Sequence, residues 1–233
     1  MKSRPITLHH ASKAKPGSAT MSFIPDWATI LQFAIATFII AITPGPDMTL
    51  FVGRALSEGR KAGFACMAGA MTGIVIHTTL VALGLSALIV ASPQAFMVLK
   101  IAGAGYLVWL AFQAVTKGSA FSPDTAKRAP RSVFQNWATG LGINLLNPKI
   151  ILFFMTFLPQ FVSVHDTNAP GKLFFLGAMF IVLSLPVTAP MVIAADKFAG
   201  LLKKSPKVTR IVDYLFAGVF SAFALKILTA QAK

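Results

Sequence analysis

Acidic residues are scarce in this sequence, and cysteine is almost absent. The 233 residues include 7 Asp and Glu against 21 Lys and Arg, and charged residues make up only 12%. A soluble domain carries about twice that fraction, and so few charges would leave its surface uncovered. The single cysteine, Cys66, excludes an internal disulfide and a cysteine-rich metal site. A disordered chain is excluded as well, because 55% of the residues are hydrophobic and 20 are Phe.

Long apolar runs take the place of the missing charges. A helix needs ~20 residues to cross ~30 Å of hydrocarbon, and continuous apolar runs favour helices over the alternating strands of a barrel. Six stretches are long enough: Trp27–Leu50, Phe64–Val90, Ala95–Thr116, Val133–Phe161, Leu173–Ala195 and Ile211–Ala230. We therefore predict an all-α polytopic membrane protein with six transmembrane helices.

The basic residues indicate an orientation. Twelve of the 21 fall in the connections after the first, third and fifth stretches. Because Lys and Arg are enriched in cytoplasmic loops, these connections are predicted to face the cytoplasm, with both termini outside. In these positions they would contact anionic membrane lipids. A net charge of +14 divided among short loops does not favour a nucleic-acid partner.

The N-terminal residues do not fit this orientation. Residues 1–20 carry four basic residues on the predicted outer side and lack the apolar core of a signal peptide. We predict that residues 1–22 are a disordered extension or an upstream misreading of a start near Met21. The membrane domain then covers 23–233, divided into two three-helix repeats at 23–131 and 132–233.

Two proline-containing segments resemble each other. With Pro46 placed on Pro148, 102 residues later, a Leu-Phe pair follows each proline at the same distance. Three helices per half is an odd number, so the second half would enter the membrane upside down, as in the inverted repeats of transporters. Chance recurrence of Pro and Phe in an apolar chain is the alternative.

Proline chemistry predicts that both segments interrupt a helix. Proline lacks the N–H that a helix interior needs, so breaks are expected at Pro44–Pro46 and at Asn147–Pro148. Asp47 would then lie in the first turn of a new half-helix. Lys149 would lie at membrane depth, where a charge costs ~3 kcal/mol, and therefore needs a partner or a function. Its distance from both ends of the stretch makes snorkelling to an interface the weaker interpretation.

These motifs resemble those of a known family. Pro44–Asp47 followed by regularly spaced glycines, Asn144–Lys149, and Gly103–Leu107 are similar to the signatures of the LysE/RhtB amino-acid exporters. The resemblance covers the chain from about Phe23 onward. It implies a small inner-membrane protein that exports amino acids at the expense of the proton gradient.

An amino acid is a zwitterion, so its site needs acceptors for the ammonium and donors for the carboxylate. Asp47 would accept the ammonium, carry the coupling proton, or both in turn. The first turns of both half-helices would offer free N–H groups, Lys149 a positive charge, and Thr43 a hydroxyl. The predicted substrate-binding or proton-coupling residues are Thr43, Pro44, Gly45, Pro46, Asp47, Asn144, Asn147, Pro148 and Lys149.

Three further groups of residues have expected roles. His77 is either a proton relay or a partner in a helix–helix hydrogen bond with Thr or Ser. Close helix packing is expected at Gly59, Gly63, Gly69 and Gly73. A hinge is expected at Pro186 and Pro190.

The function predicted from these features is secondary active export of amino acids or close derivatives by proton antiport with alternating access. The alternatives are an intramembrane enzyme that uses Asp47 and Lys149 as acid and base, and a channel. We expect no catalytic residues, no cofactor and no metal, since two of the four His lie in the first twenty residues. The expected partners are a small amino acid, protons and lipids, with a homo-oligomer left open, and the expected location is the inner membrane.

Overall fold

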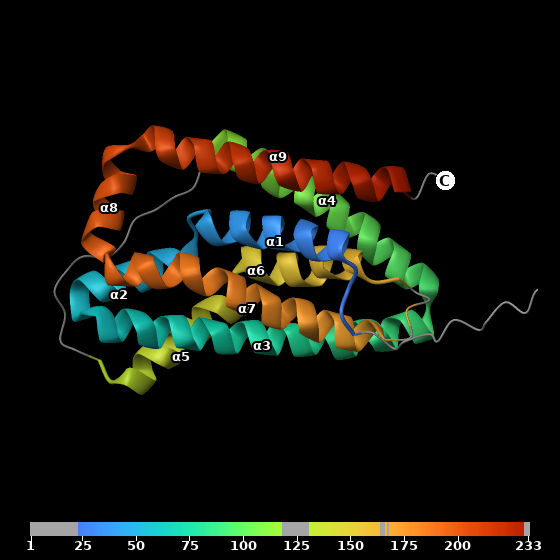
Figure 1. Ribbon diagram of the computed structural model, residues 1–233, viewed down its shortest axis with the longest axis horizontal. Helices are drawn as coiled ribbons and strands as arrows, with labels where there is room; N and C mark the ends of the chain where they lie inside the picture. The colour runs from blue at the N-terminus through green and yellow to red at the C-terminus, as the bar shows by residue number, and fades with distance from the viewer. Residues whose placement is uncertain (1–22, 118–130, 164–165, 167, 231–233) are drawn as a thin grey trace, which may run out of the picture.

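The computed structural model describes residues 23–117, 131–163, 166 and 168–230. These ranges are helical and contain no strand (Figure 1). The first half contains α1 (Trp27–Ile42), α2 (Pro46–Glu58), α3 (Arg60–Ala91) and α4 (Pro93–Lys117). The second contains α5 (Val133–Leu145), α6 (Pro148–Leu152), the π-helical turn η1 (Phe153–Phe157), the 3₁₀ turn η2 (Leu158–Phe161), α7 (Ala169–Ile193), α8 (Ala195–Lys204) and α9 (Pro206–Ala230). The all-α prediction is confirmed, whereas the expected extension at 1–22 lies outside the described residues.

Two helices in the described ranges are long and apolar enough to cross a membrane. They are Arg60–Gly84 of α3 and Ala169–Ile193 of α7. The count rises to four if each of two bent pairs forms one span: α1 with α2, bent by 49°, and α5 with residues 148–161, bent by 53°. Both predicted helix breaks are thus confirmed. Six spans remain a prediction, for which α4 and α9 have the necessary length, ~37 Å each at 1.5 Å per residue.

Elements of the same kind follow one another in the two halves. Each half begins with a broken helix pair and continues with long helices. In Figure 1, α1 and α2 run from right to left, whereas α5 and α6 run from left to right. Opposite directions are what an inverted repeat requires, although the repeat itself stays a prediction.

The helix ends gather at two ends of the bundle. The α2–α3 junction, the start of α5, and α8 lie at the left end in Figure 1, and the start of α1 and the α3–α4 junction lie at the right end. Arg54, Arg60 and Lys197 belong to the left end. The left end is therefore the one that the sequence predicts to be cytoplasmic.

Local capping explains where two helices begin. Asp26 caps α1, with its carboxylate accepting hydrogen bonds from Thr29 N at 3.0 Å and Thr29 Oγ1 at 2.7 Å. Ser132 begins α5 with a capping box, in which it exchanges side-chain-to-backbone bonds with Gln135.

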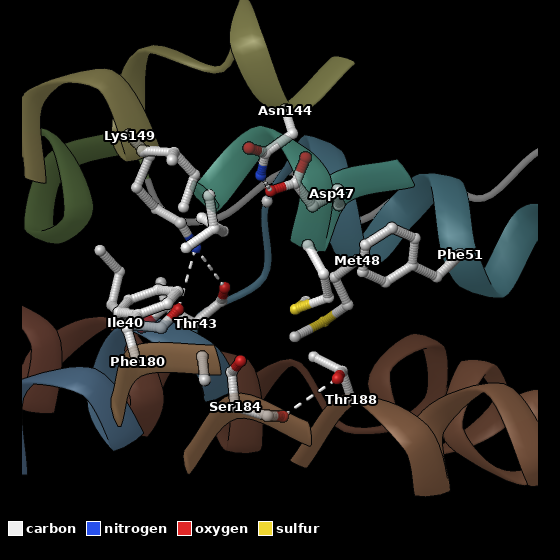
Figure 2. Close-up of a pocket in the computed structure, with 16 residues that line it drawn as sticks. Ile40, Thr43, Asp47, Met48, Phe51, Asn144, Lys149, Phe180, Ser184 and Thr188 are labelled. Carbon is white, nitrogen blue, oxygen red and sulfur yellow. Dashed lines mark hydrogen bonds between the residues drawn. The ribbon is translucent and has the colours of Figure 1, made fainter. Parts of the chain in front are cut away.

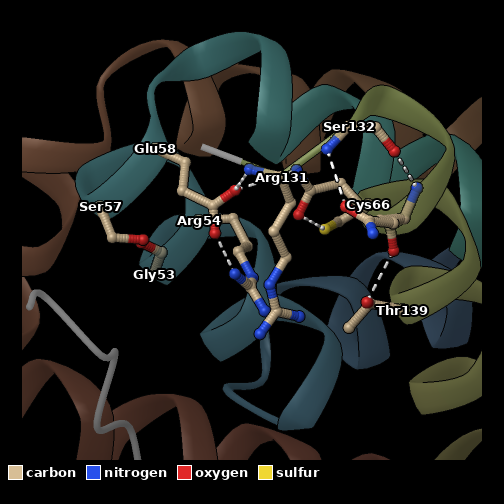
Figure 3. A network of polar contacts seen from close by, with 10 residues as sticks. Gly53, Arg54, Ser57, Glu58, Cys66, Arg131, Ser132 and Thr139 are labelled. Atoms are coloured by element: carbon tan, nitrogen blue, oxygen red, sulfur yellow. Dashed lines mark hydrogen bonds and ion pairs between the residues drawn. The ribbon is translucent and has the colours of Figure 1, made fainter. Parts of the chain in front are cut away.

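A buried carboxylate ties α2 to the start of α5 (Figure 3). Glu58 ends α2 and forms an ion pair with Arg54 one turn earlier. Its Oε2 also accepts from the backbone N of Arg131 at 3.0 Å and from Asn136 Nδ2 at 3.1 Å. Cys66 donates to the Oδ1 of the same Asn136, at 3.8 Å. Residues from both halves are therefore held together at the basic end of the molecule.

The core is rich in phenylalanine and centres on η1. Phe153, Phe154 and Phe157 are almost completely buried and pack with Phe33 of α1 and Phe220 of α9. By contrast, large apolar side chains on the outer helix faces are exposed. They include Trp27, Leu80, Phe112 and Val182. Such an apolar surface suits contact with lipid.

Helix α8 is an element that the sequence analysis did not separate from the fifth connection. Its Ala195 and Ala199 are buried against Met48 and Val52 of α2. The small apolar residues are four apart, which places them on one face of a helix. The cost of leaving that face exposed explains why this basic segment is folded onto the bundle.

Candidate functional site

The break between α1 and α2 leaves backbone acceptors without their usual donors. In a continuous helix residue 44 would donate to the carbonyl of Ile40, but Pro44 has no N–H. Helix α1 ends at Ile42, and Thr43 continues in extended conformation. The Thr43 hydroxyl donates to Ile39 O at 2.7 Å, and its predicted role in substrate binding stays a prediction. The carbonyl groups of Ile40 and Thr43 remain available for another partner.

That partner is Lys149 from the second half of the chain (Figure 2). Its Nζ donates to Thr43 O at 2.8 Å and to Ile40 O at 3.1 Å. The cation also lies at the C-terminal end of α1, where the negative end of the helix dipole stabilises it. Gly45 makes this approach feasible, because a Cβ there would lie 3.1 Å from the ammonium. The predicted need of Lys149 for a partner is thus met by backbone carbonyls.

Helix α2 begins at Pro46, with Asp47 in its first turn, as predicted. Its N-cap, Gly45, supplies no side-chain cap. The Asp47 Oδ2 accepts from Asn144 Nδ2 at 2.9 Å, which joins α2 to the end of α5. No ion pair within 4.0 Å joins Asp47 to Lys149 among these residues. Each charged group therefore has its own hydrogen-bond partners, although both line the same cavity.

The second break is capped in a different way. Asn147 begins α6, and its Oδ1 accepts from the backbone N of Lys149 at 3.1 Å. Pro148 at the first helical position has no N–H to satisfy. We expected free N–H groups in the first turn of α6, as in α2. This expectation is wrong, because the Asn147 side chain already accepts the hydrogen bond from the Lys149 N–H.

Unsatisfied polar atoms concentrate at this site. Among the described residues, the buried side-chain atoms without a hydrogen-bond partner are Thr37 Oγ1, Asp47 Oδ1, Thr49 Oγ1, Asn144 Oδ1 and Asn147 Nδ2. Three of the five belong to residues predicted from the sequence. Buried polar atoms are nearly always paired, so an unpaired carboxylate oxygen indicates a place for a ligand, a proton or water.

His77 lies beside this network rather than in it. Its Nε2 is 3.5 Å from the backbone oxygen of Asn144, and its ring stacks on Phe154 with centroids 5.9 Å apart. Among the residues that the structure describes, neither Thr nor Ser provides the hydrogen-bond partner considered for His77. Asn144 therefore contacts both groups: its backbone oxygen lies near the His77 imidazole, and its side chain binds the Asp47 carboxylate.

Glycines set how closely α3 approaches its neighbours. At Gly69 a Cβ would collide with the backbone of Trp137 on α5, and at Gly73 it would collide with the Asn144 side chain. Gly63 similarly faces the Phe51 backbone oxygen on α2. Gly59 differs from this prediction: it has a positive φ of 94°, nothing lies within 4 Å of a Cβ there, and it forms the turn between α2 and α3.

A cavity of about 50 Å³ lies between the two halves and includes this site (Figure 2). Its lining comes from α1, the α1–α2 break, α2, α3, α5, α6 and α7. Thr43, Gly45, Asp47, Asn144 and Lys149 of the predicted set contribute to it. Pro44, Pro46, Asn147 and Pro148 shape the breaks without lining the cavity.

Helix α7 supplies lining residues that the sequence analysis missed. Phe180, Ser184 and Thr188 recur every four residues and so share one helix face. That spacing was the available signal. Pro186 and Pro190 lie on α7 as well, but the helix continues through both, so the hinge remains a proposal. In the described ranges, no three His, Cys, Asp or Glu residues cluster as a metal site would require.

Known proteins resemble this chain over most of its length. A leucine efflux protein of Klebsiella pneumoniae is 27% identical over 206 residues, covering 86% of this chain and 95% of the relative. A homoserine/homoserine lactone efflux protein of Salmonella typhimurium is 29% identical over 188 residues, covering 81% and 90%. An uncharacterized membrane protein of Vibrio cholerae is 28% identical over 204 residues, covering 87% and 97%. No solved structure shows significant similarity.

The family model described as LysE type translocator matches residues 38–231. The match includes both helix breaks, Asp47, Asn144 and Lys149. The chain therefore belongs to the LysE type translocator family.

Proposed function

We propose that this protein is a secondary active transporter that exports amino acids or close derivatives from the cytoplasm. Family membership and the names of the leucine and homoserine relatives support amino-acid export. The observation that carries the mechanism is the buried, unpaired Oδ1 of Asp47 in a cavity lined by both halves. Proton antiport and alternating access are the finer parts of this proposal.

Asp47 is the exchange group in this mechanism. A carboxylate in a desolvated cavity needs a positive partner, which either a substrate ammonium or a proton supplies. Because one excludes the other, release of the substrate is coupled to uptake of a proton. The substrate carboxylate would meet the uncapped N-terminus of α2 and the third N–H of the Lys149 ammonium, since two are already bound to carbonyls.

The energies are adequate for such coupling. One proton that enters down a potential of 100 mV releases ~2.3 kcal/mol. A tenfold uphill step for a neutral zwitterion costs ~1.4 kcal/mol. One proton per amino acid therefore suffices for a moderate gradient.

The size of the cavity requires movement. A volume of about 50 Å³ holds a few water molecules but not a whole amino acid. The halves must separate on one side to admit a substrate, and rocking of the halves at 23–131 and 132–233 would do this alternately. The proposed membrane is the cell inner membrane, with the basic end in the cytoplasm against anionic lipids and both termini outside.

The test uses the full chain in proteoliposomes. Vesicles loaded with labelled amino acids are given an inward or outward pH gradient, and flux is compared for wild type, Asp47→Asn and the exposed-cap control Asp26→Asn. Asp47→Asn should abolish proton-driven flux while membrane insertion and folding stay intact, and Asp26→Asn should retain it. Full proton-driven transport by Asp47→Asn would refute the mechanism.

The same vesicles distinguish the alternative functions. A carrier shows saturable counterflow of unchanged substrate, a channel passes solute without saturation, and an intramembrane enzyme alters it chemically. Saturable counterflow of an unchanged amino acid would by itself establish transport, whichever ion is coupled to it.

A further inference from the structure

Most of the cavity wall is apolar. The lining includes Ile40, Met48, Phe51, Met71, Ile74 and Phe180. Figure 2 shows Asp47, Asn144 and Lys149 on one side, with Phe180, Ser184 and Thr188 of α7 facing them from the other. A bound amino acid that places its ammonium at Asp47 would therefore direct its side chain toward an apolar wall.

Both charged residues of the lining already have an assigned partner. Of the lining residues, Asp47 and Lys149 alone carry a formal charge. Lys149 is bound to two carbonyls, and the free oxygen of Asp47 is the acceptor for the substrate ammonium. A second charge on the substrate side chain would find no countercharge in the cavity. Burial of an unpaired charge costs several kcal/mol, so such a substrate would bind poorly.

The hydroxyl groups of α7 do not alter this balance. Ser184 donates to Ile181 O and Thr188 donates to Ser184 O, each at 3.0 Å. Both donors are thus satisfied within their own helix. An apolar group can lie against them without leaving a buried donor unpaired.

We infer that the exported amino acid has an uncharged, apolar side chain that packs against this wall, with Met48 and Phe180 setting its size. The inference rests on the proposed function, and it names the substrate class for the same site. Apolar pockets discriminate weakly between side chains that differ by one methylene but strongly against a charge that stays unpaired.

The test measures competition for counterflow in proteoliposomes. Each amino acid is tried in turn as the labelled substrate, and leucine, isoleucine, methionine, lysine, arginine and glutamate are then added as competitors. Leucine, isoleucine and methionine should compete at least about tenfold more strongly than the charged three. Saturable export of lysine, arginine or glutamate in preference to leucine would overturn the inference and leave the proposed function standing. Counterflow of no amino acid would overturn both.

A pair of variants tests the wall itself. Phe180→Leu shortens the side chain that faces the substrate, and Val182→Ala on the same helix is the control because Val182 is 64% exposed. Phe180→Leu should raise phenylalanine counterflow relative to leucine by about tenfold, whereas Val182→Ala should leave the ratio unchanged. Since Phe180 also packs against Phe153 and Phe154, Met48→Ala provides a second variant with the same expected shift. An unchanged ratio in whichever of these variants remains folded would overturn the assignment of the wall.

Discussion

The ammonium of Lys149 lies 2.8 Å from the carbonyl oxygen of Thr43, a residue 106 positions earlier in the chain. It also binds the carbonyl that Pro44 leaves without a donor. Lys149 thus has a structural function at the break between α1 and α2, in addition to any contact with substrate.

Lys149→Met should destabilise the protein. The variant leaves the buried carbonyls of Ile40 and Thr43 without partners, at about 1–3 kcal/mol each. Thermal unfolding in detergent would measure the loss. Lys172→Met is the matched control, because its ion pair with Asp166 is partly exposed and such pairs contribute about 0–1 kcal/mol. Equal losses from the two variants would contradict the structural function of Lys149.

Gly73→Ala should disturb the site without touching a charged residue. The added Cβ would collide with the Asn144 side chain, whose amide holds Asp47 at 2.9 Å. We expect a loss of proton-coupled flux together with a loss of stability. Gly84→Ala on the same helix is the control: nothing lies within 4 Å of its Cβ, so better helix propensity should add about 0.5–1 kcal/mol. Normal flux in Gly73→Ala would show that the Asn144 position is unimportant.

Glu58→Gln should loosen the basic end of the bundle. The change removes the charge that pairs with Arg54 and weakens the acceptor for the backbone of Arg131 and for Asn136. Cys66, the sole cysteine in the sequence, is buried beside Asn136 and serves as a natural reporter. Its alkylation by a maleimide should accelerate about tenfold, equivalent to ~1.4 kcal/mol of easier local opening.

The control for that experiment is Ser57→Ala. Ser57 precedes Glu58, but its hydroxyl donates only within α2, to Gly53 O at 2.9 Å. The rate of Cys66 alkylation in Ser57→Ala should match that of the wild type. If Glu58→Gln reacts no faster than Ser57→Ala, the carboxylate does not hold this end closed.

The cap of α1 should show a characteristic pH dependence. Hydrogen bonds from the side chain and backbone of Thr29 lower the pKa of Asp26. A lowered folded-state pKa means that the stabilisation is present above the unfolded value, ~3.9, and is lost as the pH falls through the folded value. Asp26→Ala should therefore cost about 1 kcal/mol at pH 7, with a cost that shrinks below about pH 4.

Ser132→Ala provides the comparison, because Ser132 caps α5 with a neutral hydroxyl. The loss in free energy of unfolding caused by Ser132→Ala should stay constant over the same pH range. Unfolding curves of both variants at several pH values check this, and parallel behaviour of the two would argue against ionised Asp26 as the cap.

The sequence predicted features that depend on local backbone chemistry. Pro44, Pro46 and Pro148 remove donors wherever they occur, so both helix breaks and the position of Asp47 in a first turn could be predicted and are confirmed. The same reasoning failed at Asn147, where a side chain competes for the N–H group that the dipole argument had left free.

Features that depend on long-range packing were beyond the sequence. The partner of Lys149 is a pair of carbonyls, and every residue has a carbonyl, so residue types gave no signal for it. The spacing of Ser184 and Thr188 indicates one helix face, but only the fold places that face opposite Asp47. The contacts of Glu58 with Arg131 and Asn136 could not be predicted for the same reason, because these two donors lie more than seventy positions later in the chain.

The hydrogen bonds from Lys149 also have a consequence for how the chain folds during synthesis. The first broken helix leaves the ribosome long before residue 149 is made, and until then the carbonyls of Ile40 and Thr43 have no such donor. Unsatisfied carbonyls are costly in hydrocarbon, so the nascent first half has to keep them hydrated or held by other groups. We therefore expect the packing of α1 against α2 at this break to be completed only after α6 has been made.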